Sequence, residues 1–227
     1  MHNNVEMLLE RIAELPDEWH AAGMLSVQVL RRIVKLTEGA PVNASAETGA
    51  GKSTLLLSHL SRNHLVFALD YGNSITNVRN SPLLRGESVT FVEGATQETL
   101  RKYDFKVKFG LVLIDGPHGY PFPDMEYWYF YPHIATGGLL ILDDIHIPTI
   151  HNLFEFLKEE QMFDYKGLVG TTAFFVRNDA PLFDPLSDGW WLQNYNKARY
   201  PATFAEKLKG FVPVGMQKIL VKLLKRN

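Results

Sequence analysis

Short apolar runs alternate with helical patterns along the middle of this chain, and this alternation restricts its fold more than any other feature. Five such runs occupy residues 42–46, 65–70, 88–93, 111–115 and 139–143. Continuous apolar strands separated by helices are typical of a parallel sheet covered on both faces. Two further runs, at 165–169 and 172–177, are too close for a parallel crossover and predict an antiparallel hairpin at one edge. We therefore expect an α/β fold with a doubly wound, mostly parallel seven-stranded sheet and an antiparallel edge strand.

The two ends of the chain depart from this alternation. Helical spacing of apolar residues predicts two helices, at about 4–15 and 18–36, with Pro16 between them. After residue 178 the alternation stops. We therefore divide the chain into N-terminal helices, a core and a C-terminal appendage, over residues 1–38, 39–178 and 179–227.

The appendage contains two features that each allow several interpretations. An apolar stripe over 213–226, flanked by Lys and Arg, fits a helix docked on its own domain or a helix lying on a membrane surface. Trp190 and Trp191 stand together in a loop-like segment, and exposed aromatic pairs usually have a use. They fit a lid over a substrate, a contact in a homodimer or packing on the sheet.

Composition excludes several classes of protein. The chain is 46% hydrophobic and 21% charged, has a formal net charge of −2 and contains no cysteine. These values indicate a globular protein with no global attraction to nucleic acid, without disulfides and without thiolate metal sites. No apolar run approaches the roughly 20 residues that span a bilayer, and the N-terminus does not resemble a signal peptide. We predict a soluble, cytoplasmic protein.

Acidic residues stand at the end of five consecutive predicted strands. They are Glu47, Asp70, Glu93, Asp115 and the pair Asp143-Asp144. In open α/β sheets ligands bind beyond the carboxyl ends of the strands. Ordinary loop polarity would scatter these charges along the surface, so the pattern predicts a ligand site along this edge of the sheet.

A glycine turn follows the first predicted strand. Gly49 and Gly51 let the backbone approach a ligand closely, and the next helix offers free N–H groups. Asp70 follows about twenty residues later, where an acid can accept hydrogen bonds from both ribose hydroxyls of an adenosyl group.

These motifs resemble a known family. The segment 47–54 (Glu-Thr-Gly-Ala-Gly-Lys-Ser-Thr), together with Asp70, resembles motif I and the following acid of class I S-adenosylmethionine-dependent methyltransferases. Residues 114–120 (Ile-Asp-Gly-Pro-His-Gly-Tyr) and 137–144 are similar to a small-molecule branch related to catechol and macrolide-sugar O-methyltransferases. The resemblance covers roughly residues 40–177. It implies a Rossmann-like methyltransferase fold and methyl transfer from S-adenosylmethionine to a small hydroxylated acceptor such as a sugar.

The resemblance also implies site residues. The cofactor would contact Glu47, Thr48, Gly49, Gly51, Ser53, Asp70, Gly94, Ala95, Thr96 and Asp115. Asp115, Asp143 and Asp144 offer oxygen ligands that suit Mg²⁺, unless one aspartate caps the next helix and another binds the cofactor amino group. His118, acting with Asp115, would remove the proton of the acceptor hydroxyl. His146 competes with it, as base or as metal ligand.

Two other functions compete with this interpretation. Gly51-Lys52-Ser53 matches the tail of a phosphate-binding P-loop, but Ala46 replaces its first glycine and Glu47 would face an anion. An NAD site is disfavoured because Leu55 replaces its third glycine. A non-catalytic adapter would keep the fold and use the tryptophan pair and the basic C-terminal tail for partner contact.

Overall fold

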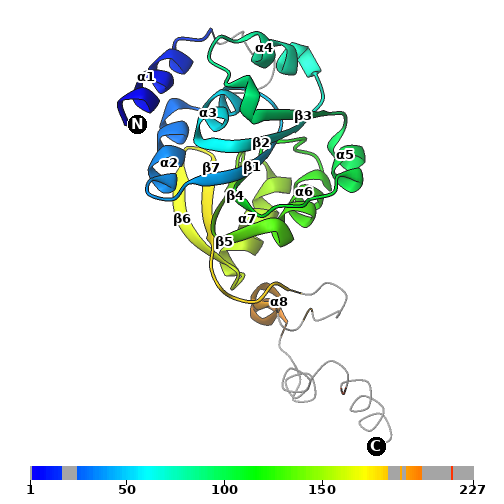
Figure 1. Ribbon diagram of the computed structural model, residues 1–227. Coiled ribbons are helices and arrows are strands. Elements are labelled where there is room, and N and C mark those ends of the chain that lie inside the picture. The colour runs from blue at the N-terminus through cyan, green and yellow to red at the C-terminus, as the bar shows by residue number, and fades with distance from the viewer. Residues whose placement is uncertain (1, 17–24, 184–189, 191–192, 201–215, 217–227) are drawn as a thin grey trace, which may run out of the picture.

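The computed structural model describes residues 2–16, 25–183, 190, 193–200 and 216 of the chain. Its centre is a seven-stranded sheet with helices on both faces (Figure 1). The strands are β1 (Val42–Thr48), β2 (Ser61–Ala68), β3 (Val89–Glu93), β4 (Phe109–Ile114), β5 (Ile134–Leu142), β6 (Phe163–Val169) and β7 (Thr172–Arg177). The helices are α1 (His2–Ala13), α2 (Val27–Thr37), α3 (Lys52–Leu60), α4 (Ser74–Asn80), α5 (Thr96–Lys102), α6 (Phe122–Phe130), α7 (Pro148–Glu159) and α8 (Asn194–Arg199). The predicted doubly wound α/β architecture is therefore confirmed.

The strand order is β3-β2-β1-β4-β5-β7-β6, and only β7 runs against its neighbours. The predicted hairpin is at the edge, but the reversed strand β7 lies one place inside it. Burial explains this order, because Ala173, Phe174 and Phe175 of β7 are fully buried whereas Asp164 and Lys166 of β6 are exposed. A strand with charged side chains suits a sheet edge.

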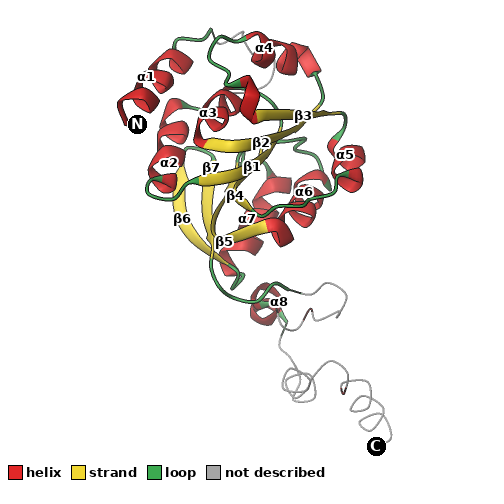
Figure 2. Ribbon diagram, viewed as in Figure 1, coloured by secondary structure: helices red, strands yellow, loops and turns green. Residues whose placement is uncertain are grey.

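Side chains of the central strands alternate between two apolar cores. Leu111 and Leu113 of β4 face the core shared with α1 to α4, and Val112 and Ile114 face the core shared with α5 to α7. Figure 2 shows these helices in red on either side of the yellow sheet. Because both faces are covered, the strands appear in the sequence as continuous apolar runs.

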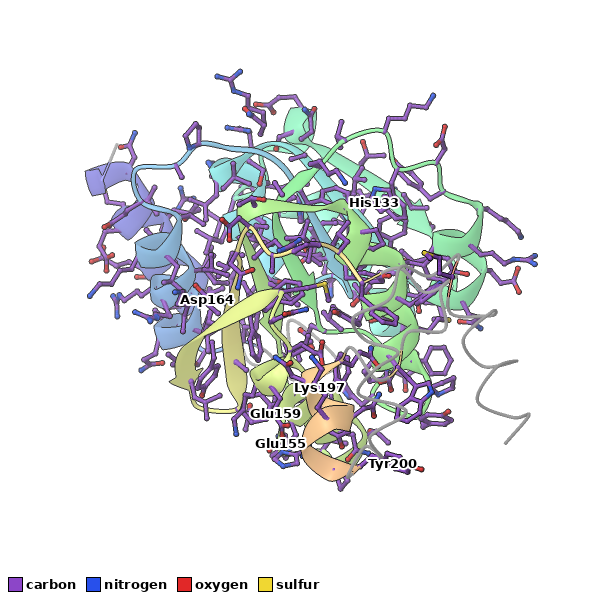
Figure 3. All side chains as sticks on the ribbon, turned by 90° about the horizontal axis from the view of Figure 1, so that it is seen from below. His133, Glu155, Glu159, Asp164, Lys197 and Tyr200 are labelled. Atoms are coloured by element: carbon purple, nitrogen blue, oxygen red, sulfur yellow. The ribbon has the colours of Figure 1, made fainter. Side chains whose placement is uncertain are left out.

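The N-terminal helices pack on α3 and contribute fully buried side chains to its core, among them Leu9, Ile12 and Leu30. At the other end, α8 packs on α7. Arg199 pairs with the Glu159 carboxylate, which is labelled beside α8 in Figure 3. Trp190 contacts Tyr200 edge-on, with 5.2 Å between ring centroids.

Most of the predicted appendage is not described. The helix predicted over 213–226 lies outside the described residues except for Met216, and Trp191 lies outside them as well. The three-part division of the chain therefore stays a prediction. No helix in the described part of the chain is long and apolar enough to cross a membrane.

The sheet has a topological switch point between β1 and β4. From β1 the chain proceeds outward through β2 to β3, whereas β4 and β5 extend the sheet in the opposite direction. The loops after neighbouring parallel strands therefore diverge at the β1–β4 boundary and leave a crevice at the carboxyl edge of the sheet.

Candidate active site

A cavity of about 780 Å³ lies at this carboxyl edge. Loops following β1, β2, β3, β4 and β5 line it, together with the β6–β7 turn, the residues just before α2 and the first turn of α2. The predicted ligand edge of the sheet therefore coincides with a cavity large enough for a cofactor and a small second molecule.

The glycine turn after β1 forms one wall of the cavity through residues 49–53. Gly49 has φ +89°, and a Cβ atom added to it would lie 2.6 Å from the backbone oxygen of Asp115. Only glycine fits there, because the turn presses directly on the loop after β4. Gly49, Gly51 and Ser53, three of the predicted cofactor residues, all line the cavity.

Lys52 also lies in this turn, but its ammonium group is hydrogen-bonded within the protein. Its Nζ donates to the backbone oxygen of Leu15, 2.9 Å away and just beyond α1, and the residue is 8% exposed. A P-loop lysine must instead reach the phosphates of a nucleotide. The geometry of Lys52 therefore does not support the nucleotide-triphosphatase alternative.

Glu47 and Thr48 lie beneath the turn and do not line the cavity. The Glu47 carboxylate accepts a hydrogen bond from the Thr54 hydroxyl, and its Oε1 lies 3.1 Å from Nε2 of the buried His64. The Thr48 hydroxyl donates to Glu126 and accepts from the N–H of Asp115. Both side chains were predicted as cofactor contacts, and the structure shows them supporting the backbone of the turn.

Asp70 stands two residues beyond β2 and does not line the cavity either. Its carboxylate accepts hydrogen bonds from the N–H groups of Ile75 and Thr76 and from the Thr76 hydroxyl, at the start of α4. The Thr76 hydroxyl holds the pKa of Asp70 below its ordinary value. Its neighbours Leu69 and Tyr71 line the cavity instead. Contact between Asp70 and a ribose therefore stays a prediction.

The loop after β3 lines the next part of the cavity through Gly94, Ala95, Thr96 and Gln97. Gly94 has φ +141°, and its N–H donates to the backbone oxygen of Ala68. The Thr96 hydroxyl is buried and has no hydrogen-bond partner. All three residues predicted in this loop (94–96) are therefore placed where they could contact a ligand.

Asp115, His118 and Asp144 converge where the loops after β4 and β5 meet. One ligand atom from each lies within 4.8 Å of the other two. Nε2 of His118 is 3.3 Å from Oδ2 of Asp144 and 3.8 Å from Oδ1 of Asp115. Asp144 has φ +54°, a left-handed conformation that few residues other than glycine, asparagine and aspartate adopt.

The other two predicted residues of this region lie beside the cluster. Asp143 lines the cavity, but its Oδ1 accepts a hydrogen bond of 2.6 Å from the Thr172 hydroxyl. His146 is largely exposed and lies outside the cavity lining, with Nδ1 3.6 Å from Oδ1 of Asp144. The cluster therefore combines two of the three predicted metal ligands with the predicted base.

The cluster concentrates negative charge. Burial, together with the nearby Asp143 and Asp144 carboxylates, raises the pKa of Asp115 to about 7. The Asp115 carboxylate in turn raises the pKa of His118, while burial opposes it. In the described part of the chain, the ion-pair partners found for these carboxylates are histidines. Such a site would be stabilised by a bound cation.

Sequence reasoning missed one buried acid at the site. Glu126 of α6 is fully buried and accepts a hydrogen bond from Thr48 beneath the cavity floor. A signal was present in the sequence, because Glu126 is four residues before Phe130 and next to Tyr127, on the buried face of an aromatic helix. An acid on such a face is rarely there without a partner or a function.

Fold and cavity together define a class: an α/β domain that binds a ligand across the switch point of a Rossmann-like sheet. Within the chain, residues 46–145 match the model of a family described as a methyltransferase domain. This match identifies residues 46–145 as a methyltransferase domain, and the sheet around them has the Rossmann-like fold of S-adenosylmethionine-dependent methyltransferases. The predicted family is therefore confirmed, and the nucleotide-triphosphatase and adapter alternatives are not supported.

Solved structures with the same fold include methyltransferases bound to cofactor. TomG from Streptomyces achromogenes, an O-methyltransferase of tomaymycin synthesis in complex with S-adenosylmethionine, has a TM-score of 0.57 and 14% identity, covering 75% of this chain and 89% of TomG. The Bacillus cereus O-methyltransferase in complex with S-adenosylhomocysteine has a TM-score of 0.55 and 17% identity, with coverages of 77% and 91%. Methyltransferase PaMTH1 of Podospora anserina, bound to S-adenosylhomocysteine, has a TM-score of 0.56 and 15% identity, with coverages of 77% and 88%. The comparison with curated proteins gave no match.

Proposed function

We propose that this enzyme transfers the methyl group of S-adenosylmethionine to a hydroxyl of a small acceptor, such as a sugar or another hydroxylated metabolite. The observation that supports this most directly is the Asp115–His118–Asp144 cluster in the wall of the cavity. It offers a base and a set of carboxylates at the switch point, where a cofactor on one side and an acceptor on the other would meet.

The cavity divides naturally into two halves. The loops after β1, β2 and β3 supply the glycine turn and residues 94–97, which suit an adenosyl cofactor. The other half is formed by the loops after β4 and β5, the β6–β7 turn and the start of α2. Apart from Asp115, this second half contains none of the predicted cofactor contacts, so we assign it to the acceptor.

His118 is the residue we assign as general base. O-methylation requires removal of a hydroxyl proton while the oxygen attacks in line with the methyl–sulfur bond. Nε2 of His118 lies close to both Asp115 and Asp144. Two carboxylates beside an imidazole stabilise the imidazolium that forms when His118 takes the proton.

A divalent cation fits the same place. Asp115 and Asp144 supply oxygen atoms within the 4.8 Å cluster, and Asp143 lines the cavity beside them. Hard cations such as Mg²⁺ prefer oxygen ligands, so we assign the carboxylates to the cation and leave His118 as the base. When bound, such a cation orients acceptor oxygens and lowers the pKa of the attacked hydroxyl.

The acceptor half of the cavity has an apolar wall. Leu25 and Val29 of the α2 region and Val169 at the end of β6 line it, next to Ser26 and Thr171. Burial of apolar surface contributes about 25 cal/mol per Å². We therefore favour acceptors that carry an apolar body beside the methylated hydroxyl over fully hydroxylated free sugars.

The proposed function is tested first by ligand binding and then by turnover. Calorimetry is expected to show binding of S-adenosylhomocysteine, and no binding of ATP or NAD, with or without Mg²⁺. S-adenosylmethionine carrying a labelled methyl group is then offered with panels of phenols, alkyl glycosides and free sugars. Label in an O-methyl product supports the proposal. Cofactor binding without transfer to any hydroxyl in the panel contradicts O-methylation and favours a non-catalytic adapter.

The metal assignment predicts a selective loss of turnover. Asp144→Asn removes one charge from the cluster and is expected to lower kcat at least about tenfold, because even the hydrogen-bond partners of metal ligands are typically worth about 10–100-fold in metal affinity or activity. Affinity for S-adenosylhomocysteine should stay within about threefold, since Asp144 belongs to the acceptor half. The measurement is kcat across an Mg²⁺ titration after chelation, and unchanged turnover in both the variant and the chelated enzyme would disprove the metal site.

The role of Asp70 is tested by separating its two tasks. Asp70→Ala removes both its hydrogen bonds to the first turn of α4 and any contact with ribose, whereas Thr76→Val removes only the hydroxyl bond to Asp70. We expect Asp70→Ala to weaken binding of S-adenosylhomocysteine at least about tenfold and Thr76→Val to leave it within about threefold, because each charged hydrogen bond contributes about 1.5–3 kcal/mol. Calorimetry measures both. Equal losses would mean that Asp70 acts only by holding α4.

A homodimer, contact of the C-terminal tail with membranes and a cytoplasmic location stay predictions from the sequence.

A further inference from the structure

Glu126 is a buried carboxyl that the chemistry above does not use. It lies on α6, on the side of the sheet opposite α3, and none of its surface is exposed. Three loops of the cofactor and acceptor site meet around it. These are the loop after β1, the loop before α5 and the loop after β4. Glu126 interacts with each of them in a different way.

The first relation is a relay of hydrogen bonds. Oε2 of Glu126 accepts from the Thr48 hydroxyl at 2.7 Å, and the same hydroxyl accepts from the N–H of Asp115 at 3.1 Å. Thr48 immediately precedes Gly49, whose backbone is pressed against the Asp115 carbonyl. Through the Thr48 side chain, Glu126 therefore fixes the contact between the glycine turn and the loop that carries Asp115.

The second relation is direct packing. A Cβ atom added to Gly116 would lie 2.6 Å from Oε2 of Glu126 and would also meet the rest of the carboxyl group. The backbone after Asp115 therefore rests on this carboxyl, and glycine at 116 is what allows the approach.

The third relation involves atoms without partners. Oε1 of Glu126 and the hydroxyl of Thr96 are both buried and unpaired, and the Thr96 hydroxyl is close enough to act on the pKa of Glu126. An unpaired buried polar atom is costly, so a native structure usually gives it a partner or a function. Burial raises the pKa of Glu126 to about 7, and the Thr48 and Thr96 hydroxyls act against that rise. Thr96 lines the cavity, so this link reaches the cofactor half directly.

We infer that Glu126 is a positioning residue of the methyltransferase site, which holds the loops ending at Thr48, Thr96 and Gly116 in the arrangement that binds the adenosyl cofactor. It touches neither cofactor nor acceptor and acts through the three loops. Its function is hydrogen bonding in a fixed place, because its Oε2 accepts from Thr48 and the buried Thr96 hydroxyl acts on the same carboxyl.

Two substitutions of similar size separate this function from simple packing. Glu126→Gln keeps one acceptor for Thr48 and offers a donor to Thr96, so its affinity for S-adenosylhomocysteine should stay within about threefold of wild type. Glu126→Leu fills the space without hydrogen bonds, and its dissociation constant should rise at least about tenfold. Thermal unfolding without ligand measures stability separately. We expect Glu126→Leu to keep a melting temperature close to that of wild type while its affinity for S-adenosylhomocysteine falls.

Glu160 provides a matched control. It is a buried residue directly after α7, is not among the residues that line the cavity, and accepts a hydrogen bond from the N–H of Tyr195. Glu160→Leu is expected to leave the affinity for S-adenosylhomocysteine unchanged even where it lowers the melting temperature. Because the readout is cofactor binding alone, the result is independent of the proposed acceptor, base and metal.

Two outcomes would overturn the inference. Wild-type affinity in folded Glu126→Leu would show that the carboxyl is not needed for positioning, and equal losses in Glu126→Gln and Glu126→Leu would show that hydrogen bonding is not its function. If Glu126→Leu does not fold, Thr48→Val removes the relay by itself, and we expect it to weaken binding about tenfold. Unchanged affinity in Thr48→Val would then reject the inference.

Discussion

Gly49→Ala is expected to reduce binding of S-adenosylhomocysteine at least about a hundredfold. The left-handed φ of +89° costs a non-glycine residue about 1–2 kcal/mol. The added Cβ would also lie 2.6 Å from the backbone oxygen of Asp115, an atom that no side-chain rotation can move away. The turn must therefore shift, and with it the wall of the cavity that faces the cofactor. Calorimetry with S-adenosylhomocysteine measures the loss.

The chain contains a matched control for this substitution. Gly39 has φ +80°, almost the same backbone conformation, but an added Cβ there meets no atom within 4 Å. Gly39→Ala should therefore lower stability by about 1–2 kcal/mol and leave cofactor affinity unchanged. The difference between the two variants isolates the close approach at Gly49 from backbone strain. Similar affinities in both variants would show that the turn tolerates displacement and does not shape the cofactor wall.

The parts of the fold that the sequence predicted well are those decided by local pattern. Apolar runs of strand length with helical spacing between them specify a covered parallel sheet, and the short link near Gly170 excludes a parallel crossover. The order of the last two strands depends on something less local. β7 takes the inner place because its side chains are buried on both faces. β6 differs because several of its side chains are exposed.

The sequence predicted which loops line the cavity better than it predicted which side chains face it. The position of a residue along a strand does not decide which partner its side chain contacts. The glycine turn and the loops after β3, β4 and β5 all line one cavity, as strand-end logic requires. Glu47 and Asp70 also stand near strand ends, yet Glu47 is bound by His64 from the neighbouring strand and Asp70 by the next helix. Those partners depend on strand register and loop conformation, which no motif encodes.

Glu126 is the converse case, a residue beside the site that no motif predicted. It lies 78 residues from Thr48 in sequence, and the contact exists only because α6 packs under the ends of β1 and β4. The motifs that predict the site consist of acids directly after strands, so they do not include an acid within an aromatic helix. The physical cue is the cost of burying it: a carboxyl on an apolar helix face requires partners, and those partners lead to the site.

His118→Gln is expected to lower kcat about 10²–10⁴-fold, the usual contribution of a general base. Glutamine preserves size and hydrogen bonding but cannot take a proton, so affinity for S-adenosylhomocysteine should stay within about threefold. His146→Gln is the matched comparison, since His146 lies near the same Asp144 carboxylate but outside the cavity lining. Single-turnover methyl transfer from labelled S-adenosylmethionine compares the two variants. If His146→Gln loses transfer and His118→Gln keeps it, the base is His146, and the acceptor must approach from the exposed side of Asp144.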